Sequence, residues 1–122
     1  MLSILIPTYN YNVFSLVKEL VDQTSKLNID FEIISLDDGS KITFVENEAI
    51  NQLKNCSFSS NETNLGRASN LNKLVEKAKF NHCLLLEADA FPENENYIKK
   101  YVSLISKNIT IAFGGVIYSS EK

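Results

Sequence analysis

Short apolar runs alternate with segments of helical periodicity along almost the whole chain, and this alternation is its most constraining feature. Five segments predict strands: the compact apolar run Leu2–Pro7, then Phe31–Leu36, Cys56–Ser59, Cys83–Leu86 and Ile109–Tyr118. Between them, apolar residues recur at helical spacing. Because helical crossovers join parallel strands, the sequence predicts a three-layer α/β/α fold with a mainly parallel sheet.

The composition fits one folded domain. The chain has 122 residues, of which 44% are hydrophobic, too many for intrinsic disorder. A formal net charge of −3 argues against a nucleic-acid partner, which normally needs a basic surplus. The sequence shows neither an apolar run of about 18 residues nor the basic start of a signal peptide. We therefore expect residues 1–122 to form a single cytoplasmic domain that does not span a membrane, with the inner face of the membrane as an alternative location.

Three predicted helices bear on the site. One covers Phe44–Leu53, and a longer one follows Thr63 and Asn64, either of which could cap it. The inward face of this longer helix is expected to consist of five apolar residues: Ala68, Leu71, Leu74, Val75 and Ala78. Pro92, followed by acidic residues, predicts the first turn of a third helix, where both residue types are favourable.

Polar segments follow four of the predicted strands and should share one edge of the sheet. In α/β folds of this kind, ligands bind beyond the carboxyl ends of the strands. Those ends carry four polar clusters: Pro7–Asn10, Asp37–Ser40, Asn61–Arg67 and Glu87–Asp89. The sequence therefore predicts a binding site at this edge.

Glu87 and Asp89 are a candidate metal-binding pair. They stand two residues apart at a strand end, so both carboxylates should project to the same side. Mg²⁺ or Mn²⁺, held by one or two carboxylates and by substrate phosphates, suits such a pair. The alternative is a solvated pair at the start of the next helix, and spacing alone does not decide between them.

The other clusters also allow two interpretations. Asp37 and Asp38 alternate faces, so at most one should enter a cleft, and both also fit ordinary turn chemistry. Gly66 and Arg67, the only arginine, stand at a helix start, which attracts phosphate, although an arginine there can simply face solvent. Tyr9 can stack on a planar base or belong to a plain strand exit.

Four segments, in this order and at these separations, resemble the N-terminal half of family 2 glycosyltransferases of the GT-A fold. The segments are ILIPTYN, FEIISLDDGS, NLGRASNLNKLVEKA and LLLEADAFP. The resemblance runs through essentially the whole chain. It implies a GT-A domain that binds a nucleotide-sugar.

For the base side of the site, the resemblance implies four residues. Pro7, Thr8 and Tyr9 would line the nucleotide pocket through backbone and ring contacts. Asp38 would accept the N3–H of a uracil-type base. Because Asp38 would then lie in a cleft, we expect its replacement to weaken nucleotide binding without affecting folding.

For the phosphate side, the resemblance implies five more. Asn64, Gly66 and Arg67 would lie against the base and diphosphate. Glu87 would stand near the ribose, and Asp89 would ligate the Mn²⁺ or Mg²⁺ that bridges the diphosphate. Glu87 departs from the usual Asp of the family's DxD element, which moves the carboxylate outward by one methylene.

The resemblance also implies a reaction and a missing part. Family 2 enzymes transfer a sugar from a nucleotide-sugar, here a UDP-sugar, to an acceptor hydroxyl by metal-assisted inverting displacement, for example in cell-surface polysaccharide synthesis. The acceptor pocket and the general base belong to the C-terminal half of the family's domain. We expect the base to lie outside these 122 residues.

Other functions remain as alternatives. The chain could be a non-catalytic nucleotide-sugar-binding module or a fragment that lacks the base. A sugar nucleotidyltransferase would need a glycine-rich basic loop after the first strand, and PTYNYN is neither. A receiver-type signalling domain carries its paired acids after the first strand, not the second. We also expect self-association through Ile109–Tyr118, whose apolar edge would be open.

Overall fold

Strands and helices alternate along the chain as predicted. The computed structural model describes residues 1–105 and 111–113. Its elements are β1 (Leu2–Thr8), α1 (Phe14–Ser25), β2 (Phe31–Asp37), α2 (Val45–Ala49), the 3₁₀ helix η1 (Ile50–Gln52), β3 (Cys56–Ser60), α3 (Arg67–Lys77), β4 (Cys83–Leu85), α4 (Tyr97–Ile105) and β5 (Ile111–Phe113). The strands form one parallel sheet in the order β3-β2-β1-β4-β5. The predicted α/β class is confirmed.

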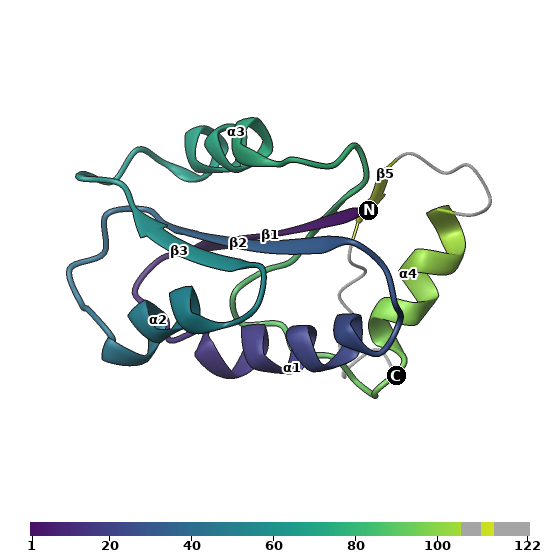
Figure 1. The fold of residues 1–122 in the computed structure, drawn as a ribbon. Coiled ribbons are helices and arrows are strands. Elements are labelled where there is room, and N and C mark those ends of the chain that lie inside the picture. Colours follow the sequence, from purple (N-terminus) through teal and green to yellow (C-terminus); the bar gives the residue numbers. More distant parts are fainter. Residues whose placement is uncertain (106–110, 114–122) are drawn as a thin grey trace.

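The sheet is the middle of three layers (Figure 1). Helix α3 covers one face, and α1 and α2 lie across the other, with α4 beside α1. The central strand β1 is covered on both sides, and its residues Ile4, Leu5 and Ile6 have no exposed surface. This burial on both faces explains why β1 and β2 read as nearly continuous apolar runs, whereas the edge strand β3 is partly exposed and does not.

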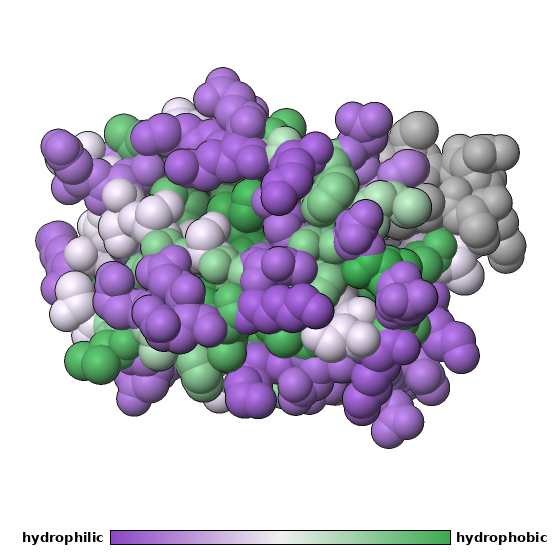
Figure 2. Space-filling view, viewed as in Figure 1, coloured by the Kyte–Doolittle hydropathy of each residue, from purple (hydrophilic) through white to green (hydrophobic). Residues whose placement is uncertain are grey.

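Each face of the sheet has its own core. Ile4, Ile6 and Ile33 pack with the buried residues of α1 and with Ile98 of α4. On the other face, the core is smaller and consists of Leu5, Ile34, Leu36 and Leu74. Figure 2 shows hydrophilic side chains over the two outer layers and hydrophobic ones mainly in the band between them. None of the helices within the described residues is long and apolar enough to cross a membrane.

Two predicted helices differ from the prediction, one in its length and one in its N-cap. The expected helix over Phe44–Leu53 is shorter, because α2 ends at Ala49 and a 3₁₀ turn follows. Thr63 and Asn64 do not cap α3. The N-cap is Gly66, with φ 96° and ψ 155°, a conformation that favours glycine.

The prediction that Pro92 opens the last helix is wrong, since α4 begins at Tyr97. The side chain of Asn94 accepts a hydrogen bond from the Asn96 N–H (2.8 Å), which folds this segment into its own turn. Buried Gln23 then accepts from the N–H of Ile98 (2.9 Å) and satisfies the start of the helix.

The predicted strand Ile109–Tyr118 lies mostly outside the described residues. Its described part, Ile111–Phe113, forms β5 and pairs with β4, Cys83 opposite Ile111. The self-association expected from this strand stays a prediction.

Ser35 is an anomaly in the core. It lies in the middle of β2 between Ile6 and Phe58, has no exposed surface, and by strand alternation shares the face of Ile33. Its Oγ is the only buried side-chain polar atom without a hydrogen-bond partner among the described residues. An unsatisfied buried hydroxyl is destabilising.

We therefore expect Ser35→Ala to leave the free energy of unfolding unchanged or raise it by up to about 1 kcal/mol. Ser3→Ala is the matched control, because Ser3 is equally buried but donates to Glu32 and accepts from the Phe80 N–H. This control should lose about 1–3 kcal/mol. Urea unfolding measures both variants. An equal loss in the two would show that the Ser35 hydroxyl has a partner.

Candidate functional site

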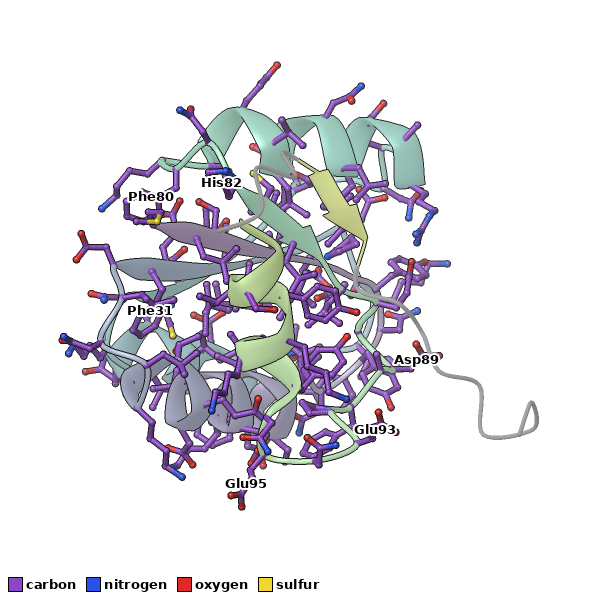
Figure 3. The ribbon with its side chains drawn as sticks, turned by 90° about the vertical axis from the view of Figure 1, so that its right-hand side faces the viewer. Phe31, Phe80, His82, Asp89, Glu93 and Glu95 are labelled. Atoms are coloured by element: carbon purple, nitrogen blue, oxygen red, sulfur yellow. The ribbon has the colours of Figure 1, made fainter. Side chains whose placement is uncertain are left out.

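A pocket of about 390 Å³ lies where β1, β2 and β4 end and α3 begins. It falls within the size range of small-molecule sites. All nine residues predicted from the sequence line it: Pro7, Thr8, Tyr9, Asp38, Asn64, Gly66, Arg67, Glu87 and Asp89. Figure 3 shows Asp89 at the side of the molecule toward which the arrows of β4 and β5 point, with Phe80 and His82 at the other side.

The carboxylate of Asp38 joins two walls of this pocket. It is 5% exposed and follows directly after β2. Its Oδ1 accepts hydrogen bonds from the Leu65 N–H (2.8 Å) and the Asn61 side chain (3.0 Å), and its Oδ2 accepts from the Gly66 N–H (2.9 Å). Asn64 adds a bond from its side chain to the Asp38 carbonyl (3.1 Å). The turn after β2 is thereby fixed to the loop that enters α3.

These contacts determine the ionisation of Asp38. Burial alone would raise the pKa of its carboxyl, but the bonds from Leu65, Asn61 and Gly66, with the charge of Lys73, hold it below the ordinary value of 3.8. A carboxylate oxygen has two lone pairs, so Oδ2, with one internal bond, keeps one acceptor position. Asp38 is therefore a buried anion that can accept one further hydrogen bond.

Asp37 has a different role from its neighbour. It does not line the pocket, and its carboxylate accepts hydrogen bonds from the Ser40 N–H (2.8 Å) and the Ser40 hydroxyl. Gly39 between them has φ 70°, and a Cβ there would meet the Thr63 carbonyl carbon at 2.4 Å. The turn therefore needs glycine, and only one of the two aspartates enters the cleft, as the alternation of faces predicts.

Arg67 and Glu87 form an ion pair at the pocket. Arg67 donates from Nη1 to Glu87 Oε1 (2.9 Å) and from Nη2 to Oε2. The hydrogen bond and the opposite charge of Glu87 raise the pKa of Arg67. Both side chains stay about half exposed, 60% and 41%, so the pair adds little to stability and remains open to exchange with an anion. It links the start of α3 to the segment after β4.

Asp89 is the remaining candidate metal ligand. It is exposed at the pocket, whereas both oxygens of Glu87 already bond to Arg67. No group of three His, Cys, Asp or Glu side chains within the described residues could hold a metal ion. Mg²⁺ is commonly held by one or two carboxylates together with substrate phosphates. One carboxylate at an open pocket fits a metal that arrives with a diphosphate, and does not fit a metal held by protein alone.

Three pocket residues were missed by sequence reasoning: Tyr11, Asn70 and Ala88. Asn70 is 2% exposed, and its side chain donates to the Leu36 carbonyl (3.0 Å) and accepts from Asn61 (2.9 Å). It lies on the buried side of α3, whereas Ala68 and Val75, which we expected on the inward face, are both exposed. The Leu36 carbonyl of β2 needs a hydrogen-bond donor from α3, and the pattern of apolar residues does not indicate which residue supplies it.

The fold and the pocket define an α/β domain with a polar binding site at the carboxyl edge of its sheet. The model of glycosyl transferase family 2 matches residues 3–122. The chain therefore belongs to this family. No curated protein matches the chain.

Several solved structures are similar to the chain. TarS from S. aureus is 25% identical over 87% of the chain, with a TM-score of 0.63. A crystal structure of its residues 1–349 in complex with UDP-GlcNAc gives 25% identity and a TM-score of 0.64. The mannosyltransferase PcManGT from Pyrobaculum calidifontis, in complex with GDP-Man and Mn²⁺, is 18% identical over 86% of the chain with a TM-score of 0.63, a likeness of fold alone. The chain covers 19%, 31% and 32% of these three structures. The predicted likeness to GT-A glycosyltransferases is confirmed.

Replacing Asp38 by asparagine should destabilise the chain, contrary to our expectation from sequence that folding is unaffected. The amide cannot accept all three internal bonds, and a lost bond to a charged acceptor costs about 1.5–3 kcal/mol. Because the folded-state pKa lies below 3.8, the contribution of Asp38 is complete above that pH and is lost as pH falls through the folded-state pKa.

Urea unfolding at neutral pH and in acid tests this effect. The difference in stability between wild type and Asp38→Asn should be largest near neutral pH and shrink in acid below the ordinary aspartate pKa of 3.8. Asp22→Asn is the control, since Asp22 lies on the exposed face of α1. A difference that does not change with pH would contradict the account.

Proposed function

We propose that the pocket binds a UDP-sugar and that the chain is the nucleotide-sugar-binding part of a glycosyltransferase. One observation carries the proposal: a buried carboxylate with one unused acceptor position, an arginine and an exposed carboxylate line the same pocket. The family match supports it. So do the TarS structures in complex with UDP and UDP-GlcNAc, which are 25% identical to the chain.

The uracil would occupy the end of the pocket formed by Asp38 and Tyr9. The unused acceptor position of Asp38 Oδ2 suits the N3–H of uracil, and the exposed ring of Tyr9 suits stacking. Guanine also offers an N–H donor, but it is the larger base, and we propose that the pocket takes uracil. Pro7 and Thr8 line the same pocket and would contact the base through their backbone.

The diphosphate would lie across the start of α3. There Asn64, Gly66 and Arg67 line the pocket together, and the guanidinium of Arg67 can exchange Glu87 for phosphate oxygens. Asp89 would hold Mn²⁺ or Mg²⁺ together with the diphosphate, and Glu87 would then face the ribose. Such a metal supplies charge stabilisation for a departing diphosphate.

The proposed reaction is inverting transfer to an acceptor hydroxyl. In it, a general base takes the proton of the acceptor hydroxyl, whose oxygen attacks the anomeric carbon while the bond to the diphosphate breaks. The residues around the pocket serve the leaving group, and we assign the base and the acceptor site to sequence outside this chain. The chain spans at most 32% of the TarS structures, which leaves room for such a part. A non-catalytic binding module is the second candidate on the same observation. A cytoplasmic location, at or near the inner membrane face, is part of this proposal.

Calorimetry with UDP tests the proposal. UDP should bind in the presence of Mn²⁺, and a chelator should weaken the affinity by about tenfold or more, as loss of a charged contact does. GDP is the comparison ligand and should bind more weakly. Absence of UDP binding under every condition would contradict the proposed function.

The Asp89→Asn variant tests the metal-binding role of Asp89 separately from the nucleotide-binding residues. This variant should bind UDP with Mn²⁺ no better than wild type does with chelator. The same substitution at Asp22, outside the pocket, should change nothing. Equal affinity of wild type with and without chelator would remove the metal role from Asp89 and leave the nucleotide site in place.

A further inference from the structure

One wall of the pocket carries two tyrosines on a segment that is neither helix nor strand. Tyr9 and Tyr11 both line the pocket, between the end of β1 and the start of α1. Their exposed fractions are 45% and 43%, so packing holds each ring on one side only. The backbone of residues 9–13 must therefore be fixed by other contacts if the rings are to present a constant surface.

The first contact is made by Asn10 itself. Its side chain accepts hydrogen bonds from the N–H groups of Lys41 (3.0 Å) and Ile42 (3.3 Å), and its own N–H donates to Ser40 Oγ (2.5 Å). Asn10 has φ 52°, an uncommon conformation that these bonds maintain. They fix the segment between the two tyrosines to the turn after β2.

The second contact comes from outside the pocket. Asn47 of α2 is 3% exposed and does not line the pocket. Its Nδ2 donates to the Tyr11 carbonyl (2.9 Å), and its Oδ1 accepts from the Val13 N–H (2.9 Å). One buried amide thus satisfies the backbone on both sides of Asn12 and holds Tyr11 between two fixed points, Asn10 and Val13.

We infer that Asn47 is a positioning residue for the nucleotide pocket: it fixes the backbone of Tyr11 so that the tyrosine wall is formed before the nucleotide binds. The inference rests on the proposed function and assigns a role to a residue that touches no ligand. Without this clamp, binding would have to order Tyr11 and its neighbours, which weakens affinity. The role differs from plain stabilisation of α1, because it predicts a change at Tyr11 and in affinity.

Asn47→Ala tests the inference, with Asn51→Ala as the matched control. Asn51 also makes a pair of bonds to the backbone: it accepts from the N–H of Phe58 (2.9 Å) and donates to the Phe58 carbonyl (3.3 Å). Phe58 lies on the edge strand β3, and neither residue lines the pocket. Both variants should lower the melting temperature. Only Asn47→Ala should weaken UDP affinity, by about tenfold, since ordering a few side chains costs that much.

A second readout follows the tyrosines directly. The chain has five tyrosines and no tryptophan. Their ring signals can be followed by ¹H–¹³C NMR and assigned with Tyr9→Phe and Tyr11→Phe variants. The Tyr11 signal should shift in Asn47→Ala and stay in place in Asn51→Ala. If Asn47→Ala lowers only the melting temperature, with affinity per folded molecule and the Tyr11 signal as in wild type, the inference is wrong.

Two further outcomes are also decisive. If Asn47→Ala does not fold, Asn47→Asp replaces it, because the aspartate keeps the acceptor for Val13 but sets an oxygen against the Tyr11 carbonyl. It should show the same two changes, and their absence overturns the inference. If wild type binds no UDP, the proposed function fails. The Tyr11 signal alone then tests whether Asn47 positions Tyr11. A shifted signal in the variant would support this role, and an unchanged signal would overturn it.

Discussion

The site depends on one buried carboxylate that holds two loops together. Asp38 accepts hydrogen bonds from Leu65, Gly66 and Asn61, and these join the end of β2 to the start of α3. A buried charge is stable only when such donors surround it. Because the pocket lies between the two loops, its shape is fixed by bonds inside the protein before any ligand is present. Asp38 is therefore both a structural anchor and the proposed contact for the base.

Around this anchor, four buried or partly buried asparagine side chains supply hydrogen bonds that hold the loops at the carboxyl ends of the strands. Asn10, Asn47, Asn61 and Asn70 each bond to backbone or to another side chain at the carboxyl edge of the sheet. Short amide side chains suit this task, since each offers a donor and an acceptor within reach of nearby loops. The result is a polar framework around the pocket. The exposed groups Arg67 and Asp89 are left for phosphate and metal in the proposed function.

The sequence was sufficient for the fold because strands buried on both faces leave an unmistakable apolar signal, as in Leu2–Thr8. It was also sufficient to bring nine residues to one edge, since parallel strands end there together. It was not sufficient for Asn70 of α3, because the carbonyl that this side chain satisfies belongs to Leu36 of β2, which is far away in the sequence. The prediction that the last helix begins at Pro92 was wrong for a similar reason. The start of α4 is set by Gln23, a residue far away in the sequence.

A crystal structure of the chain with UDP is the most direct test of this role of Asp38. Uracil should lie between Tyr9 and Asp38, with its N3–H on Asp38 Oδ2, while the bonds from Leu65 and Gly66 to Asp38 persist. The diphosphate should lie against Arg67. UDP bound elsewhere, or bound here only after Asp38 has released the loop before α3, would contradict the claim that this carboxylate forms the site in advance.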